Sequence, residues 1–379
     1  MQGVLRLTNP VQPYAWGSLT AIADLLGRPA PGTPEAELWL GAHPSAPSKL
    51  DSGQTLRELI AEDPVGHLGS AVARRFEQRL PFLLKVLAAA QPLSLQAHPS
   101  LAQAREGFRL ENERGVPLTA PHRNYKDANH KPEILCALTP FHALCGFRRL
   151  DDTVRLFGAL GLETTRLASG LRGYFEWVMT LEREPRATLV AQVERACATP
   201  PPGWERECGW ALRLCRAYPG DVGVVGALLL NLLTLEPGQA IFLPAGNLHA
   251  YLEGVGVELM ANSDNVLRGG LTPKHVEVAE LLRVLDFTHG PVNVLAPSGA
   301  VAVYPTSAPD FELTRVTVAG PVELPRRGAE LLLVTSGQVR VNGQTLARGQ
   351  SAFLGANERG AVRLEGDGVV FRATVGVGE

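Results

Sequence analysis

Apolar residues follow helical spacing in some parts of the chain and form short, strand-like blocks in others. Helical spacing in the first part predicts three short helices, at residues 19–27, 55–63 and 71–80. Thr55 and Glu58 have the spacing of a capping box, which satisfies backbone N–H groups at a helix start. The apolar blocks that follow predict two pairs of strands, one joined around Gln91 and Pro92 and one at 133–138 and 142–147.

The pattern changes between residues 150 and 218. Four successive stretches there carry apolar residues at helical spacing: DDTVRLFGALG, LASGLRGYFEWVMTLE, RATLVAQVERACA and ERECGWALRLCRAY. PPPG at 200–203 interrupts the run, and YPGD at 218–221 ends it. We interpret 150–218 as an α-helical insertion, after which strands resume at GVVGALLLNLLTL. The 39 Gly and 29 Pro, scattered along the chain, favour many short strands joined by tight turns.

An internal repeat connects two distant parts of the sequence. LEPGQAIFLPAGNLHAY (235–251) aligns without gaps with LARGQSAFLGANERGAV (346–362). Each copy has a glycine turn, a strand and a second turn, which together predict two related antiparallel barrels or jelly rolls. A common strand-turn pattern that arose twice is the alternative. Gly360 stands in the second copy where the first has His249, so we expect the second barrel to bind no metal.

Composition narrows the class of protein. A chain of 379 residues predicts two or three domains. The net charge of −2, without a run of Lys or Arg, argues against a nucleic-acid or membrane-surface partner. MQGVLRLTNP lacks a signal-peptide core and the apolar run at 224–235 is too short to span a bilayer, so we expect a cytoplasmic protein. The five cysteines lack CxxC spacing, so a disulfide framework or thiolate zinc site is not expected.

PLSLQAHPS (92–100) raises the question of chemistry. In an extended chain Ser94, Gln96 and His98 share one face, and on this pattern alone a half-solvated strand is the favoured interpretation. Two further polar residues sit at the starts of apolar strands: Glu133 after Pro132, and His249 after a turn. Gln96, His98, Glu133 and His249 make a set of nitrogen and oxygen ligands that suits an open zinc site.

Charged residues accompany these candidate ligands. Lys131, Arg268 and Lys274 lie in the same segments, among apolar and turn residues, and favour an anionic substrate group such as phosphate. Glu258 lies between apolar neighbours in VELM. A carboxylate in that setting should be paired or functional, because an unpaired buried charge is costly.

Several long motifs carry a resemblance to a known family. They are YAWGS (14–18), ELWLGAHPSAPS (37–48), LSLQAHP (93–99), NYKDANHKPE (124–133), LTPFHALCGFR (138–148), YPGDVGV (218–224), IFLPAGNLHAYLEG (241–254) and SDNVLRGGLTPKH (263–275). In this order they resemble type I mannose-6-phosphate isomerases (phosphomannose isomerases), which are zinc-dependent cupin enzymes. The helical insertion is the part that departs most from the family.

The resemblance implies a fold and its domains. It implies a mainly β protein with two cupin, or jelly-roll, barrels and an α-helical insertion domain. We expect a catalytic cupin domain from 1–149 and 219–294, the insertion at 150–218, and a degenerate carboxyl-terminal barrel without metal at 295–379.

The resemblance also implies an activity, the interconversion of mannose 6-phosphate and fructose 6-phosphate through a cis-enediol. The family's ligands for one zinc ion per chain match Gln96, His98, Glu133 and His249. Its catalytic arginine matches Arg268, and other active-site groups match Ser94, Lys131, Glu258 and Lys274. We assign Arg268, Glu258 and Lys131 to catalysis, and Ser94 and Lys274 to substrate binding. Glu258 is our first choice as base, with Lys131 and His130 as alternatives.

Two other functions stay open on the sequence alone. A metal-dependent cupin oxygenase uses similar ligands, but it gives no reason for the cluster of cations. A non-catalytic sugar-sensing cupin should carry an output module, and the sequence shows neither a helix-turn-helix pattern nor a basic patch. We expect a sugar phosphate as the small-molecule partner and a monomeric enzyme.

Overall fold

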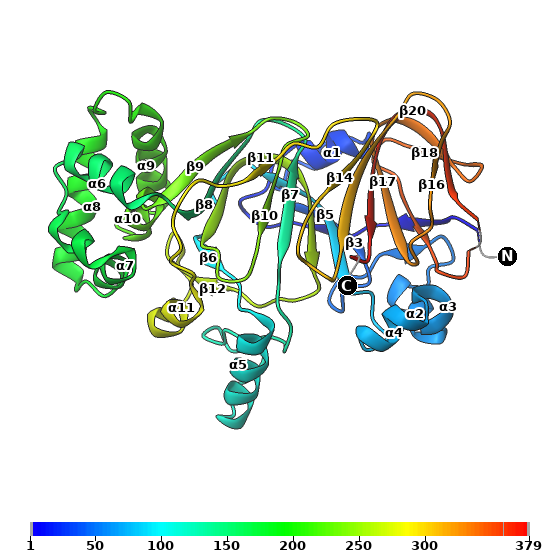
Figure 1. The fold of residues 1–379 in the computed structure, drawn as a ribbon, viewed down its shortest axis with the longest axis horizontal. Coiled ribbons are helices and arrows are strands. Elements are labelled where there is room, and N and C mark those ends of the chain that lie inside the picture. Colours follow the sequence, from blue (N-terminus) through cyan, green and yellow to red (C-terminus); the bar gives the residue numbers. More distant parts are fainter. Residues whose placement is uncertain (1–2, 359, 377–379) are drawn as a thin grey trace.

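Two antiparallel sheets form the body of the structure, a computed structural model that describes residues 3–358 and 360–376 (Figure 1). The central sheet has eleven strands within these residues: β2 (Val11–Gln12), β3 (Glu37–Gly41), β5 (Phe82–Ala89), β6 (Gln96–Ala97), β7 (Glu133–Ala137), β8 (Phe141–Phe147), β9 (Leu230–Leu235), β10 (Ala240–Leu243), β11 (His249–Ala261), β12 (Leu267–Arg268) and β13 (Val294–Leu295). The predicted mainly β character is therefore confirmed.

Strand β11 joins the two layers of the central sheet. Its second half pairs with β5 and β7, whereas its first residues pair with β6 and β8. Strands β10, β7, β11, β5 and β3 lie side by side in that order. Because β11 belongs to both layers, polar side chains at its two ends can face the same interior space.

The C-terminal sheet has nine strands among the described residues: β1 (Leu5–Thr8), β4 (Lys49–Leu50), β14 (Val301–Tyr304), β15 (Glu312–Val318), β16 (Val322–Leu324), β17 (Glu330–Val341), β18 (Gln344–Ala347), β19 (Ser351–Leu354) and β20 (Val362–Thr374). Strand β1, from the start of the chain, lies between β19 and the edge strand β4 of this sheet. Our division of the chain into domains stays a prediction; residue 359 and residues 377–379 of its last segment lie outside the described residues.

The sequence repeat corresponds to the same local structure in both sheets. Gly238 and Gly349 both take positive φ angles, 87° and 81°, in a turn that opens a four-residue strand. Each turn is closed by the following glutamine, whose side-chain oxygen accepts from a backbone N–H at 2.9 Å (Glu236 to Gln239, and Ala347 to Gln350). Positive φ favours glycine, which explains why this residue recurs.

The helices fall into three groups. The first lies near the start of the chain: α1 (Ala21–Leu25), α2 (Leu56–Glu62), α3 (Pro64–Leu68) and α4 (Ser70–Arg75). Within this group α1 lies apart from α2, α3 and α4 (Figure 1). The second packs at the far end of the central sheet: α6 (Leu150–Ala159), a 3-10 turn (Thr165–Ser169), α7 (Leu171–Met179), α8 (Arg183–Cys197), α9 (Glu205–Ala217) and α10 (Gly223–Leu228). The third comprises α5 (Leu101–Glu113) and α11 (Val278–Val284). None of the described helices is long and apolar enough to cross a membrane.

The core between the two sheets sets which face of the central sheet is free for chemistry. Leu84, Val86 and Ala88 of β5 pack toward the C-terminal sheet, where they meet buried residues such as Leu331 and Phe371. Alternate residues of β5, including Lys85, therefore point to the other face. That face lies away from the C-terminal sheet.

Several sequence predictions are confirmed and others are wrong in detail. The capping box of Thr55 and Glu58 is present. The strand expected after Pro92 is reduced to Gln96–Ala97, and Pro99, which has no N–H to donate, limits its end. The helix expected at 71–80 ends at Arg75, since Glu77 and Gln78 take positive φ angles of 52° and 59°.

Two helices show where apolar patterns mislead. Residues 223–228 form helix α10, not the expected strand. All six residues are buried, and a segment that is apolar on every side gives no period to distinguish a helix from a strand. Helix α5 was not predicted, although Ser100 and Gln103 form a capping box that marks its start.

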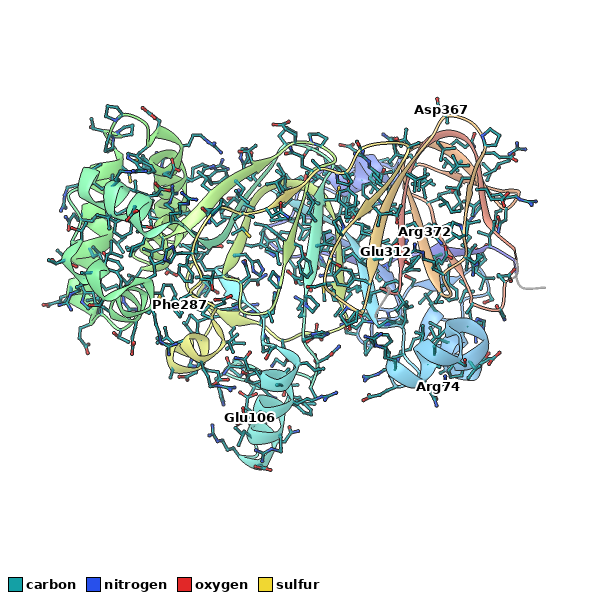
Figure 2. The ribbon with its side chains drawn as sticks, viewed as in Figure 1. Arg74, Glu106, Phe287, Glu312, Asp367 and Arg372 are labelled. Carbon is teal, nitrogen blue, oxygen red and sulfur yellow. The ribbon has the colours of Figure 1, made fainter. Side chains whose placement is uncertain are left out.

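A buried ion pair in the C-terminal sheet generates a prediction on stability. Glu330 is fully buried and receives two hydrogen bonds from Arg372, at 2.7 and 2.8 Å (Arg372 is labelled in Figure 2). Glu330→Ala leaves a buried guanidinium unpaired and should lower the free energy of unfolding by about 3–5 kcal/mol. Glu365→Ala removes an exposed partner of Arg340 and should cost about 0–1 kcal/mol. Urea denaturation of the intact chain measures both, and equal losses would contradict the account.

Candidate metal centre and active site

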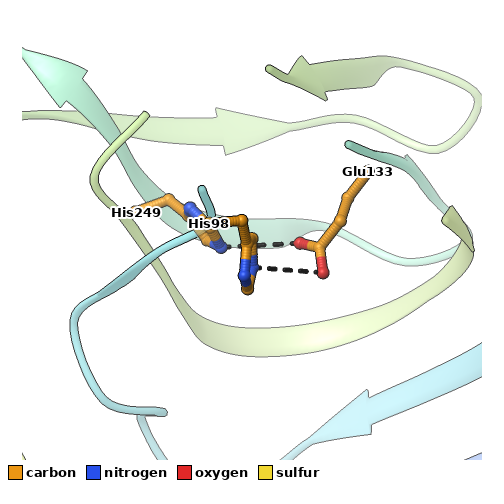
Figure 3. Close-up of side chains that lie close together, drawn as sticks. All are labelled: His98, Glu133 and His249. Atoms are coloured by element: carbon orange, nitrogen blue, oxygen red, sulfur yellow. Dashed lines mark ion pairs between the residues drawn. The ribbon is translucent and has the colours of Figure 1, made fainter. Parts of the chain in front are cut away.

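Three buried side chains from separate strands meet at one point of the central sheet (Figure 3). Glu133 begins β7, His249 begins β11, and His98 follows β6. Each is at most 1% exposed, and their ligand atoms all lie within 4.8 Å of one another. Within the described residues this is the one His, Cys, Asp and Glu cluster compact enough to hold a metal ion.

The distances suit a tetrahedral ion. Nε2 of His98 lies 3.3 Å from Oε1 of Glu133, and Nε2 of His249 lies 3.5 Å from Oε2. Zinc bonds of about 2.0–2.2 Å in a tetrahedron separate ligand atoms by about 3.3–3.5 Å. Each imidazole nitrogen thus lies from one carboxylate oxygen of Glu133 at the separation expected for two ligands of one zinc ion.

Gln96 completes the set of four that the sequence predicts. Its amide nitrogen lies 3.3 Å from Nε2 of His249, and a 180° turn of the amide places Oε1 at the same position. The backbone of Gln96 pairs with His249 on one side and with Arg268 on the other. The two-residue strand β6 therefore carries a candidate ligand directly between the metal centre and the candidate catalytic arginine.

Backbone carbonyls orient both imidazoles. Nδ1 of His98 donates to the carbonyl oxygen of Asn265 at 2.7 Å, and Nδ1 of His249 donates to that of Asn247 at 3.0 Å. Each Nε2 is left with a lone pair that points toward Glu133. Nε2 of His98 and Oε2 of Glu133 are buried and have no hydrogen-bond partner. Orphaned acceptor atoms that converge in this way fit a cation.

The protonation states also suit metal binding. Burial lowers the pKa of His98 to about 4, so its imidazole is neutral at pH 7. Burial alone would raise the pKa of Glu133, but the charge of Lys131 and the neighbouring imidazoles hold it well below its usual range. A neutral imidazole and an ionised carboxylate are the forms that bind zinc.

Lys131 is held against the metal centre. Its ammonium lies 3.0 Å from Oε1 of Glu133, and the residue is 8% exposed. The sequence grouped Lys131 with Arg268 and Lys274 as cations for an anionic substrate group. In the structure its ion-pair partner is the candidate ligand Glu133, so it lies beside the metal centre.

Glu258 is paired, as its apolar setting predicts. It lies 3.2 Å from the ammonium of Lys85, which lies directly opposite it on β5. Lys85 also lies 3.5 Å from Glu37 of β3. Burial raises the pKa of Glu258 against the opposing charge of Lys85, whereas for Lys85 the two carboxylates outweigh burial and raise its pKa.

The strand register explains this row of charges. Trp39, Lys85, Glu258 and Leu135 lie opposite one another across four strands, so their side chains share one face of the sheet. Glu133 lies two residues from Leu135 on β7 and shares that face. Glu258 and Lys85 therefore line the same interior surface as the metal centre.

Two remaining cations lie at the edge of the site. Arg268 is half-buried on β12, and burial lowers its pKa. Lys274 is exposed, and its pKa is lowered first by partial burial and then by the charge of Arg268. Two neighbouring cations without a described carboxylate partner form a local surplus of positive charge. Such a surplus suits a phosphate group.

Ser94 lies in the same segment but is less well defined chemically. It is half-buried, and the next residue, Leu95, donates its backbone N–H to the carbonyl of Gly270 at 3.1 Å. Leu95 in turn accepts from Gly269 at 2.8 Å. Ser94 is thus adjacent to the turn after Arg268.

Sequence reasoning missed Lys85 and Glu37. Lys85 is the single charge in the fully buried strand FLLKVLAA, and Glu37 is buried in ELWLG. A lone charge in an apolar strand is the same signal that singled out Glu258, so both could have been found.

Asp264 was quoted within a motif but not singled out. A contact with His43, 3.5 Å away, lowers its pKa.

Comparison with known proteins points to one family. Residues 4–150 match the family described as phosphomannose isomerase type I, catalytic domain. The mannose-6-phosphate isomerase of Salmonella typhimurium is 40% identical over 97% of this chain and 98% of its own length. That of Homo sapiens is 36% identical over 98% of each chain.

Solved structures agree with this result. A mannose 6-phosphate isomerase from Salmonella typhimurium, solved with fructose 6-phosphate and zinc, superposes with a TM-score of 0.90. It is 38% identical and covers 99% of this chain and 100% of its own. The predicted mainly β, cupin fold is confirmed, whereas its description as two separate barrels stays a prediction. On sequence and structure alike, this chain belongs to the type I phosphomannose isomerase family.

Proposed function

We propose that this protein is a zinc-dependent aldose–ketose isomerase that interconverts mannose 6-phosphate and fructose 6-phosphate. The observation that carries the proposal is the buried meeting of His98, Glu133 and His249, whose ligand atoms lie within 4.8 Å of one another, with Nε2 of His98 and Oε2 of Glu133 free of hydrogen-bond partners. The Salmonella relative that was solved with zinc and fructose 6-phosphate supports both the ion and the substrate. A coupled assay of mannose 6-phosphate conversion, with and without a chelator, tests it directly.

We propose that one zinc ion is held by Gln96, His98, Glu133 and His249. When bound there, zinc supplies a Lewis acid that polarises the substrate oxygens at C1 and C2. Side chains of the protein then transfer the proton between C2 and C1 of the substrate. Isomerisation requires that a base remove the proton at C2 of the aldose and return it at C1 of the resulting enediol.

Glu258 remains our first choice as that base. It is 3% exposed and shares the interior face with the metal centre, and burial raises its pKa toward the working range of a base. Its partner Lys85 can keep the ionised form stable before proton transfer. Lys131, beside Glu133, and His130 stay alternatives.

Arg268 and Lys274 are proposed to serve the anionic parts of the substrate. Arg268 pairs with Gln96 in the sheet and so lies one strand away from the metal centre. A guanidinium keeps its charge at all working pH values and presents a planar fork of donors, which suits the oxygens of an enediolate. We propose that Lys274, on the exposed turn beyond it, binds the phosphate, and that Ser94 also contributes to substrate binding. A monomer in the cytoplasm, without a nucleic-acid partner, remains our expectation.

The metal assignment predicts that His98→Ala loses zinc and turnover together. The purified protein should contain one zinc per chain, and the mutant much less than one, as measured by elemental analysis. His142→Ala is the matched control, because His142 lies on β8 and contacts Thr234 instead of the metal centre. Full zinc occupancy in His98→Ala would refute the assignment of His98 as a ligand. A second stoichiometric ion bound beyond residue 295 would refute the expectation of one zinc per chain and of a C-terminal barrel without metal.

The proposed base predicts that Glu258→Gln lowers kcat by about 10²- to 10⁴-fold, the usual contribution of general acid–base catalysis. The amide keeps the shape of the side chain but cannot take up the proton. Glu253→Gln on the same strand pairs with an exposed arginine and should leave kcat unchanged. Steady-state kinetics at equal zinc content measure both. A near wild-type kcat for Glu258→Gln would move the base to Lys131 or His130.

The two outer cations should differ in kinetics. An interaction that forms only in the transition state lowers kcat when it is removed, whereas loss of a uniform binding interaction mainly raises KM. Arg268→Ala should therefore lower kcat by about 10²-fold or more, as loss of a preorganised charge stabiliser does. Lys274→Ala should chiefly raise KM for mannose 6-phosphate. The reverse pattern at unchanged zinc content would mean that the two roles are exchanged.

A further inference from the structure

One side chain from the C-terminal sheet contacts the active-site segment. Asp310 lies in the loop between β14 and β15, and its Oδ2 is 2.9 Å from Nε2 of His130. The carboxylate is 2% exposed, whereas the imidazole is 19% exposed. His130 immediately precedes Lys131 and lies three residues before Glu133. The contact therefore connects the two sheets right beside the metal centre.

The loop that carries Asp310 is a fixed support. Its neighbours Ala308 and Phe311 are buried in the core between the sheets, together with Ile134 and Cys136 of β7. The hydroxyl of Tyr304, where the loop begins, donates to the carbonyl oxygen of Gly238 at 2.8 Å. Side chains packed in a protein core move little. The loop therefore holds Asp310 in a fixed position against the central sheet.

Residues 129–131, just before Glu133, are each held by a polar contact. The carbonyl oxygen of Asn129 accepts from Asn265 at 2.8 Å and from Ser263 at 3.2 Å. Lys131 contacts Glu133 at 3.0 Å. Between these anchors, the side chain of His130 is bound by the second sheet instead of the first. Asp310 thus supplies the anchor that the catalytic sheet does not.

We infer that Asp310 is a positioning residue that acts through His130 to hold residues 129–132, and with them the Lys131 ammonium, at the metal centre. This inference rests on the function proposed above. A carboxylate that accepts from an imidazole N–H fixes both the tautomer and the direction of the ring. A buried carboxylate is costly unless it is paired, which makes this contact a strong constraint on the loop.

The first test compares two substitutions at one position. A displacement of about 1 Å at a reacting group can cost about 10²-fold in rate. Asp310→Ala should therefore lower kcat by about 10-fold or more, with zinc content near wild type. Asp310→Asn should recover much of that loss, because its amide oxygen can still accept from Nε2–H. The matched control is Glu312→Gln, which removes an acidic group that pairs with Arg327 in the same sheet (Glu312 is labelled in Figure 2) and should leave kcat unchanged.

A double-mutant cycle separates positioning from general destabilisation. If Asp310 acts through His130, adding Asp310→Ala to His130→Ala should cause no further loss of kcat. Losses that multiply, or an Asp310→Ala enzyme with wild-type kcat, would overturn the inference. So would an Asp310→Asn enzyme as slow as Asp310→Ala while both melt at the wild-type temperature.

A structural readout keeps the inference testable apart from the proposed function. Crystal structures of the wild type and Asp310→Ala should show residues 129–132 displaced in the variant, and an unmoved Lys131 would contradict the inference. Failure of the wild type to convert mannose 6-phosphate would refute the proposed function alone. An active wild type together with an unaffected Asp310→Ala would refute the inference alone.

Discussion

The burial of Glu133 is the constraint on which the site depends. A carboxylate that is 1% exposed must be matched by positive charge, and Lys131 supplies one such charge directly. The second oxygen faces His249 and has no hydrogen-bond partner. Because both imidazoles donate through Nδ1 to backbone carbonyls, their Nε2 atoms present lone pairs instead of protons. A cation is the group that would satisfy all of these acceptors together.

The sheet makes this arrangement rigid. Glu133 begins β7 and His249 begins β11, and these two strands pair directly with each other, so a shift of either ligand would require a shift of the whole ladder. The same register places Lys85 opposite Glu258, which keeps two charged groups on the interior face. The opposite face packs against the C-terminal sheet. The second sheet therefore supports the geometry of the first over a broad apolar surface and, at Asp310, through a polar contact as well.

Much of the site could be predicted because its residues interrupt otherwise apolar patterns. Gln96 and His98 stand on one face of an extended segment, Glu133 opens a strand, and His249 follows a turn. The resemblance to a family then added roles that spacing alone could not assign. The helical region after residue 150 followed from periodicity, which is most reliable in long segments. The mainly β fold followed from the internal repeat, the scattered glycine and proline turns and the resemblance to the family.

Other features depend on contacts between distant residues and could not be predicted. Asp310 and His130 are 180 positions apart, and nothing in either segment indicates the other. Helix α10 is buried on all sides, so its apolar run fits a strand equally well. Lys85 is a different case, because the sequence shows it as a single charge in an apolar strand. Its ion-pair partners Glu37 and Glu258 come from other strands and could not be identified from the sequence.

Anomalous diffraction at the zinc edge, from crystals of the zinc-loaded protein, tests the central claim most directly. The account predicts one strong peak among Gln96, His98, Glu133 and His249, at about 2.0–2.2 Å from the ligand atoms. A site without a peak at full zinc loading, or a single peak elsewhere in the chain, would contradict it.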